Sequence, residues 1–75
     1  MKVWEIVKEE NEGKLYLDCD LGGIYKLIYF GVNLELINVE NDKLITDSYI
    51  TGSLLEIDFA EVVEIIKDTN NNLSV

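Results

Sequence analysis

The feature that most constrains the fold is an alternating segment that runs into a pair of glycines. Over residues 15–21, apolar side chains occupy every second position, and Tyr16, Asp18 and Asp20 occupy the positions between them. A period of two is typical of a strand with one buried and one solvated face. The Gly-Gly pair at 22–23 follows, and such a pair between strand-like segments is a strong hairpin signal. The sequence therefore predicts a β-hairpin whose first strand buries its leucines and exposes its tyrosine and acids.

The middle of the chain continues this strand-rich pattern. Residues 24–30 are rich in β-branched and aromatic side chains and are predicted to form the returning strand. Both faces of that strand are largely apolar, so we expect it to be central and covered on both sides. Residues 34–39 and 44–50 predict two further strands, separated by a polar turn.

The two ends of the chain add other elements to the hairpins. Residues 1–12 predict a short helix with an apolar stripe, and Trp4 is expected to anchor that helix on the sheet. Gly13 is expected to end it, because glycine enters the left-handed C-cap conformation at no cost. Residues 59–67 leave two alternatives open, because their apolar spacing suits a helix and their β-branched side chains suit a closing strand.

Together these elements predict a single α+β domain. It has an N-terminal helix packed on an antiparallel sheet of about four strands, with a C-terminal short helix, a closing strand, or both. The domain is expected to span residues 1–67, followed by a flexible polar tail over residues 68–75. The residues expected in its core are Leu15, Leu17, Leu21, Leu27, Ile28, Leu36, Phe59 and Val63.

Composition narrows the possible partners. The chain has 75 residues, of which 48% are hydrophobic, and a domain this small buries only ~60% of the surface of its unfolded chain. Some apolar surface therefore stays exposed, which indicates a homo-oligomer or a dedicated partner surface. The formal net charge of −9 opposes binding to nucleic acids and anionic membranes and favours basic partners. The alternative is that the charge only keeps the domain soluble.

The inventory of reactive side chains argues against an enzyme. The chain has no histidine and a single cysteine, which excludes Ser-His-Asp and Cys-His constellations and an ordinary zinc site. Cys19 lies between two aspartates whose negative charges disfavour a thiolate. Asp18 and Asp20 could hold a Ca²⁺ or Mg²⁺ ion, but acids are common on any solvated strand face. We expect no enzyme activity, no cofactor and no metal, and a cytoplasmic location because no stretch has the length of a signal peptide or membrane span.

The strand face that alternates with the leucines is the predicted partner-binding surface. Tyrosine buries a large area at a small entropy cost, and the neighbouring acids complement a basic partner. The alternative is that a helix or a second subunit covers the tyrosines. The residues expected to bind the partner are Tyr16, Asp18, Asp20, Tyr25, Tyr29, Glu35, Glu40 and Asp42.

The two ends of the chain also carry a recognisable pattern. Residues 1–7 read Met-Lys-Val-Trp-Glu-Ile-Val, a Gly-Lys step at 13–14 leads into a strand, and residues 58–64 place an acid and an aromatic before glutamates and valines. This pattern resembles small phage and prophage proteins of unassigned function, and more distantly phage anti-defence proteins that counter Thoeris immunity by sequestering a signalling nucleotide. The resemblance implies a short helix near residues 53–57 followed by a strand. The middle of this chain is shorter than theirs and lacks their basic or tryptophan-bearing positions, so no functional residue carries over.

We therefore expect a non-catalytic acidic interaction protein. It would be phage-encoded and would bind and inhibit a host defence protein with a basic surface in the host cytoplasm. The alternative is an oligomer that binds or sequesters a small ligand such as a nucleotide between its subunits. Neither function involves direct binding to nucleic acid or membrane, and a homo-oligomer is compatible with both.

Overall fold

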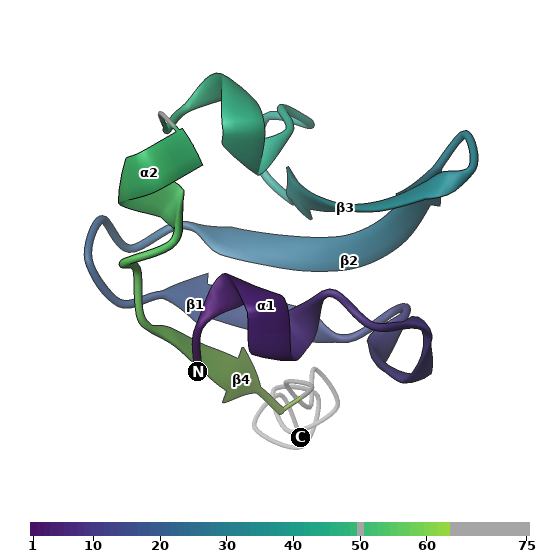
Figure 1. Ribbon diagram of the computed structural model, residues 1–75, viewed down its shortest axis with the longest axis horizontal. Helices are drawn as coiled ribbons and strands as arrows, with labels where there is room; N and C mark the ends of the chain where they lie inside the picture. Colours follow the sequence, from purple (N-terminus) through teal and green to yellow (C-terminus); the bar gives the residue numbers. More distant parts are fainter. Residues whose placement is uncertain (50, 64–75) are drawn as a thin grey trace, which may run out of the picture.

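The computed structural model describes residues 1–49 and 51–63, and its centre is a four-stranded antiparallel sheet. The strands are β1 (Leu15–Asp18), β2 (Ile24–Phe30), β3 (Asn33–Asn38) and β4 (Phe59–Val62). Their order across the sheet is β3-β2-β1-β4, so the hairpin of β1 and β2 is central and β4 closes one edge (Figure 1). This confirms the predicted α+β fold and decides the open alternative in favour of a closing strand at Phe59–Val62. The predicted domain end at 67 and tail over 68–75 lie outside the described residues.

The helices are short and contribute to one core. They are the α-helices α1 (Val3–Ile6) and α2 (Thr51–Leu54) and the 3-10 helices η1 (Glu9–Asn11) and η2 (Ile45–Asp47). Three of these segments each supply one residue to the core cluster, namely Ile6, Ile45 and Leu54. In Figure 1 α1 lies in front of the sheet and α2 above it. The helix predicted over 1–12 is thus broken into two pieces.

Two local hydrogen bonds hold the chain where α1 ends. The carbonyl of Ile6 accepts from the backbone N–H of Lys8 at 2.7 Å and from the side-chain amide of Asn11 at 2.9 Å, bonds that replace the helical ones lost there. Trp4, expected to anchor the helix, is 57% exposed, and Ile6 packs on the sheet in its place. Met1 ties this segment to β4, because its amine donates to the carbonyl of Phe59 and its carbonyl accepts from the Phe59 N–H, both at 2.6 Å.

The strand β1 buries the opposite face from the one that the sequence predicted. Tyr16 and Asp18 are 1% and 0% exposed, whereas Leu15 and Leu17 are half-buried. Tyr25, directly opposite Tyr16 on β2, is 4% exposed. The expectation that these tyrosines and Asp18 form an exposed surface is therefore wrong. The helices cover this face, and the tyrosine rings supply much of the apolar volume that packs beneath them.

The core lies between this face of the sheet and the helices. Of the eight residues predicted to be in it, Leu27, Leu36 and Phe59 are buried, and the predictions for Leu21 and Val63 are wrong because both are largely exposed. The remaining three are half-buried on the other side of the sheet. The buried apolar residues are Ile6, Tyr16, Tyr25, Leu27, Leu36, Ile45, Leu54, Ile57 and Phe59.

No described helix contributes a buried residue to the opposite side of the sheet, which we name the open face. The prediction that β2 is covered on both sides is therefore confirmed for the side that the described helices pack on, and it stays a prediction for the open face. Pairing places Leu15 beside Val62 and Leu17 between Ile24 and Ala60, so the apolar side chains of three strands adjoin one another. The residues of the open face are Leu15, Leu17, Ile24, Lys26, Ile28, Phe30, Asn33, Glu35, Ile37, Ala60 and Val62.

The strand predicted over 44–50 is reduced to a single bridge between Ile37 and Leu44. The chain then turns inward as η2, in which the N–H of Asp47 donates to the carbonyl of Leu44 at 2.9 Å. This turn places Ile45 in the core, where its burial outweighs continued pairing along the edge of β3.

Replacing Leu27 by alanine should destabilise the domain by about 2–5 kcal/mol, because the side chain is fully buried and its removal leaves a cavity. The free energy of unfolding from urea titration measures this change. Leu21→Ala is the matched control, since Leu21 is 74% exposed and its loss should cost less than about 0.5 kcal/mol. Equal losses in both variants would contradict the assignment of the core.

Candidate functional site

Two short loops of the same design close the end of the sheet where β1 and β3 finish. In the first, Asp18 Oδ1 accepts hydrogen bonds from the backbone N–H groups two and three residues on, at 2.7 and 3.0 Å. In the second, Asn38 Oδ1 accepts the equivalent pair at 2.8 and 3.2 Å. Each loop is therefore a single turn capped by the side chain of its first residue.

The two loops also have the same backbone hydrogen bonds. In both loops the N–H of the first residue donates to the carbonyl of the sixth at 2.8 Å, and its carbonyl accepts from the N–H of the fifth, at 2.7 and 2.9 Å. The fifth residues, Gly22 and Asp42, have φ values of 91° and 61°. Glycine adopts this left-handed conformation freely, and aspartate is among the residues that tolerate it best.

The two loops lie side by side. A Cβ atom on Gly23 would lie 3.1 Å from the side-chain nitrogen of Asn38, so only glycine fits without a shift of its neighbours. A shallow hollow of about 180 Å³ separates the loops, lined by residues 22–24 and 38–40.

Three of the predicted binding residues meet at this end. Asp20 is on the first loop, Glu40 and Asp42 are on the second, and all three are exposed. We name these three residues the acidic loop end. Leu21 and Val39 are exposed beside them, so apolar surface accompanies the charge.

A neighbouring ion pair borders the acidic loop end. Lys2 Nζ lies 2.8 Å from the carboxylate of Asp58, the residue before β4. This hydrogen bond raises the pKa of Lys2 and lowers that of Asp58. Because both groups are solvated, the pair adds little to stability and mainly offsets the charge of Asp58.

The remaining predicted residues lie elsewhere. The structure places Tyr29 at the far end of β2, where its hydroxyl donates to Glu9 at 3.0 Å, an interaction that raises the pKa of Tyr29. Glu35 is on the open face, and Tyr16 and Tyr25 are buried. The predicted binding residues are thus divided among the core, the far end of β2, the open face and the acidic loop end, and the three acids of the loop end are the exposed ones that stay together.

Asp18 has a structural role that the sequence did not reveal. Its Oδ1 caps the first loop, and its Oδ2 accepts a hydrogen bond from the hydroxyl of Tyr49, which follows η2. Burial of the phenol, and secondarily this bond, raises the pKa of Tyr49. Both oxygens of Asp18 are therefore occupied, which leaves Asp18 and Asp20 without a free pair of ligands for a cation. In the described ranges no cluster of three or more potential ligands could hold a metal ion.

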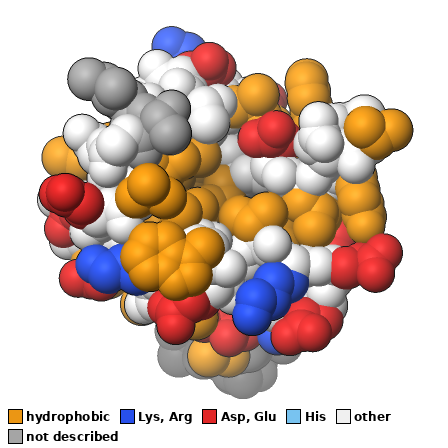
Figure 2. All heavy atoms as spheres, viewed as in Figure 1, with side chains coloured by type: hydrophobic (Ala, Val, Ile, Leu, Met, Phe, Trp, Pro, Cys, Tyr) orange, Lys and Arg blue, Asp and Glu red, His pale blue; other side chains and the backbone are white. Residues whose placement is uncertain are grey.

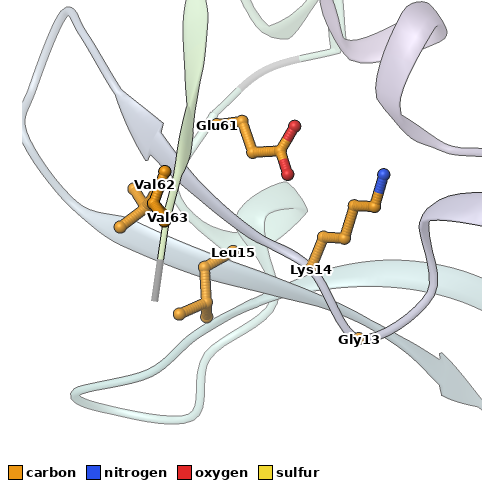
Figure 3. Close-up of a pocket in the computed structure, with 6 residues that line it drawn as sticks. All are labelled: Gly13, Lys14, Leu15, Glu61, Val62 and Val63. Carbon is orange, nitrogen blue, oxygen red and sulfur yellow. The ribbon is translucent and has the colours of Figure 1, made fainter. Parts of the chain in front are cut away.

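A second hollow lies where β1 and β4 meet beside Gly13. Its volume is about 260 Å³, and it is lined by residues 13–15 and 61–63. Figure 3 shows Lys14 and Glu61 extending toward the same space, with apolar Leu15 and Val62 apart from them. One charge of each sign gives no net attraction for an ionic ligand. Both hollows are smaller than most small-molecule sites, which are roughly 300–1,000 Å³.

The helix-bearing side carries exposed aromatic surface. Figure 2 shows apolar side chains across the middle of this side with charged side chains around them. Trp4 and Tyr29 are 57% and 46% exposed. None of the described helices has both the length and the apolar character needed to cross a membrane.

Replacing Asp18 by alanine should destabilise the domain by about 2–4 kcal/mol, since two backbone N–H groups and a tyrosine hydroxyl lose their buried acceptor. Asp20→Ala is the control, because that side chain is exposed and should contribute less than about 0.5 kcal/mol. Thermal and urea unfolding measure both changes. If the two variants were equally stable, the Asp18 carboxylate would not hold the loop.

Substitutions at the fifth positions of the two loops are expected to change the stability of the domain in opposite directions. Gly22→Ala should cost about 1–2 kcal/mol, because alanine is strained at this φ. Asp42→Gly should be neutral or stabilising by up to about 1 kcal/mol, because it removes a side chain from the left-handed conformation. A melting temperature that falls for both variants would show that the loops are not equivalent.

Comparison with known proteins adds no relative: no family model, curated protein or solved structure matches this chain.

Proposed function

We propose that the protein is a non-catalytic acidic interaction protein that binds a partner protein with a basic surface through its acidic loop end. The observation that carries the proposal is the pair of matching loops, which hold Asp20, Glu40 and Asp42 exposed at one end of the sheet. Exposed Leu21 and Val39 supply apolar contact area beside these charges.

The rigidity of the loops favours binding. Each loop is fixed by two side-chain and two backbone hydrogen bonds, so its carboxylates are presented on a backbone that is ordered before a partner arrives. Preordered contacts lose less conformational entropy on association. The net charge of −9 adds long-range attraction to a basic partner and speeds encounter.

The partner class follows from this charge and from the resemblance at the chain ends. A host defence protein that handles nucleic acid has a basic surface for phosphates, and an acidic domain can occupy that surface and inhibit it. In this proposal the protein is phage-encoded and acts in the host cytoplasm. Nucleotide sequestration has less support, because the two hollows are small and one lysine, Lys14, is the cation lining them in the described part of the chain.

The proposal predicts that neutralising the acidic loop end abolishes partner capture. The triple variant Asp20→Asn, Glu40→Gln, Asp42→Asn should retain the fold, because the loop bonds use the backbone of these residues and the side chains of Asp18 and Asn38. Host proteins retained by the immobilised wild-type chain should elute with rising salt and be lost from the variant. Quantitative mass spectrometry of the eluates measures the difference.

A matched control removes the same number of charges elsewhere. Glu5→Gln, Glu10→Gln and Glu12→Gln neutralise exposed acids on or beside α1 and η1. This control should capture the same proteins as the wild type. Equal capture by both triple variants, or loss only in the control, would contradict the acidic loop end as the binding surface.

A further inference from the structure

We infer that the open face is the interface of a homodimer, covered by the open face of a second copy of this chain. An antiparallel sheet with one solvated side normally alternates apolar and polar residues, with the polar side outward. Here the uncovered side is the more aliphatic one, and Phe30 is 57% exposed on it. A continuous apolar sheet face of this kind is typical of surfaces that bind another protein.

The charges of the open face identify the occupant. In the described strands it carries one cation, Lys26, and one anion, Glu35. They occupy diagonal positions, because Lys26 pairs with Ile37 and Glu35 pairs with Ile28. They do not pair with each other, since the ion pair found in the described residues is Lys2 with Asp58. Each of the two charges is therefore available to a partner.

A second copy satisfies both charges at once. A two-fold axis that passes between β2 and β3 places Lys26 opposite the partner subunit's Glu35, and the partner subunit's Lys26 opposite Glu35, as an isologous interface requires. A purely basic or purely acidic partner would match one charge and oppose the other. The open face is also locally neutral, so the acids that give the chain its net charge of −9 lie outside this contact.

The same geometry predicts which residues meet their own copies. The axis is roughly perpendicular to the line from Lys26 to Glu35, so it passes near the other diagonal, which joins Ile28 and Ile37. Two sheets packed face to face lie ~10 Å apart, and side chains on such an axis contact their counterparts. Ile28 should therefore face the partner subunit's Ile28.

Charge reversal tests the pairing in the full-length chain. Wild-type protein should be dimeric by analytical ultracentrifugation at micromolar concentrations and ~0.15 M ionic strength. Lys26→Glu or Glu35→Lys should weaken dimerisation by about tenfold or more, because like charges then face each other twice. The double variant should recover dimerisation, because it restores both pairs. Lys8→Glu, an exposed lysine beside η1, is the control with the same charge change and should dimerise like wild type.

Disulfide trapping provides a readout that does not depend on affinity. Ile28→Cys in a Cys19→Ser background should form a covalent dimer under mild oxidation, and Leu21→Cys in the same background, on a loop outside the face, should not. Circular dichroism confirms that each variant is folded. A wild-type chain that stays monomeric at all concentrations would overturn the inference, as would a dimer that neither charge reversal weakens. Trapping at Leu21→Cys instead of Ile28→Cys would overturn it as well.

Discussion

The buried carboxylate of Asp18 is the interaction on which the arrangement of the sheet depends. A charge removed from water is tolerated only where other groups satisfy it, and both oxygens of Asp18 accept hydrogen bonds from the loop and from Tyr49. Because side chains alternate along a strand, burying Asp18 also turns Tyr16 inward and Leu15 and Leu17 outward. The burial of Asp18 thus leaves the aliphatic side chains on the open face and places the tyrosines in the core. It also links the first loop to the segment after η2 through Tyr49.

Local patterns in the sequence were enough to predict the hairpin and the α+β class, and to offer a closing strand as one of two alternatives for the C-terminal segment. A period of two and a Gly-Gly pair are local features, and they place β2 where the structure has it, whereas β1 ends three residues earlier than predicted, at Asp18, where the capped loop begins. Which face of β1 is buried could not be predicted in the same way. Both faces carry large side chains, and the group that makes Asp18 acceptable in the interior, Tyr49, is distant in sequence and belongs to a segment that the pattern assigned to a strand.

The candidate site, too, could be predicted from the sequence only in part. Asp20 was identified from the polar face of the strand predicted over 15–21, and Glu40 and Asp42 from a polar turn. The antiparallel order of β1, β2 and β3 brings all three to one end of the sheet. Tyr29 was placed with them because it shares a strand face with Tyr25, and Glu35 because it is acidic, but the strand register separates both from the loops. One readable signal was missed: an aspartate or asparagine followed four residues later by glycine or aspartate marks both capped loops, and it is visible at Asp18 and Asn38.

The repeated loop also has an evolutionary consequence. Its path is specified by an oxygen-bearing side chain at the first position and a residue that tolerates positive φ at the fifth. The intervening residues contribute to the path mainly through their backbone, apart from Asn41, whose side chain accepts from the N–H of Lys43. Side chains at those intervening positions can therefore change with little effect on how the chain folds. A domain of this size gains from that separation, because mutation can change the side chains exposed on its loops while leaving its architecture intact.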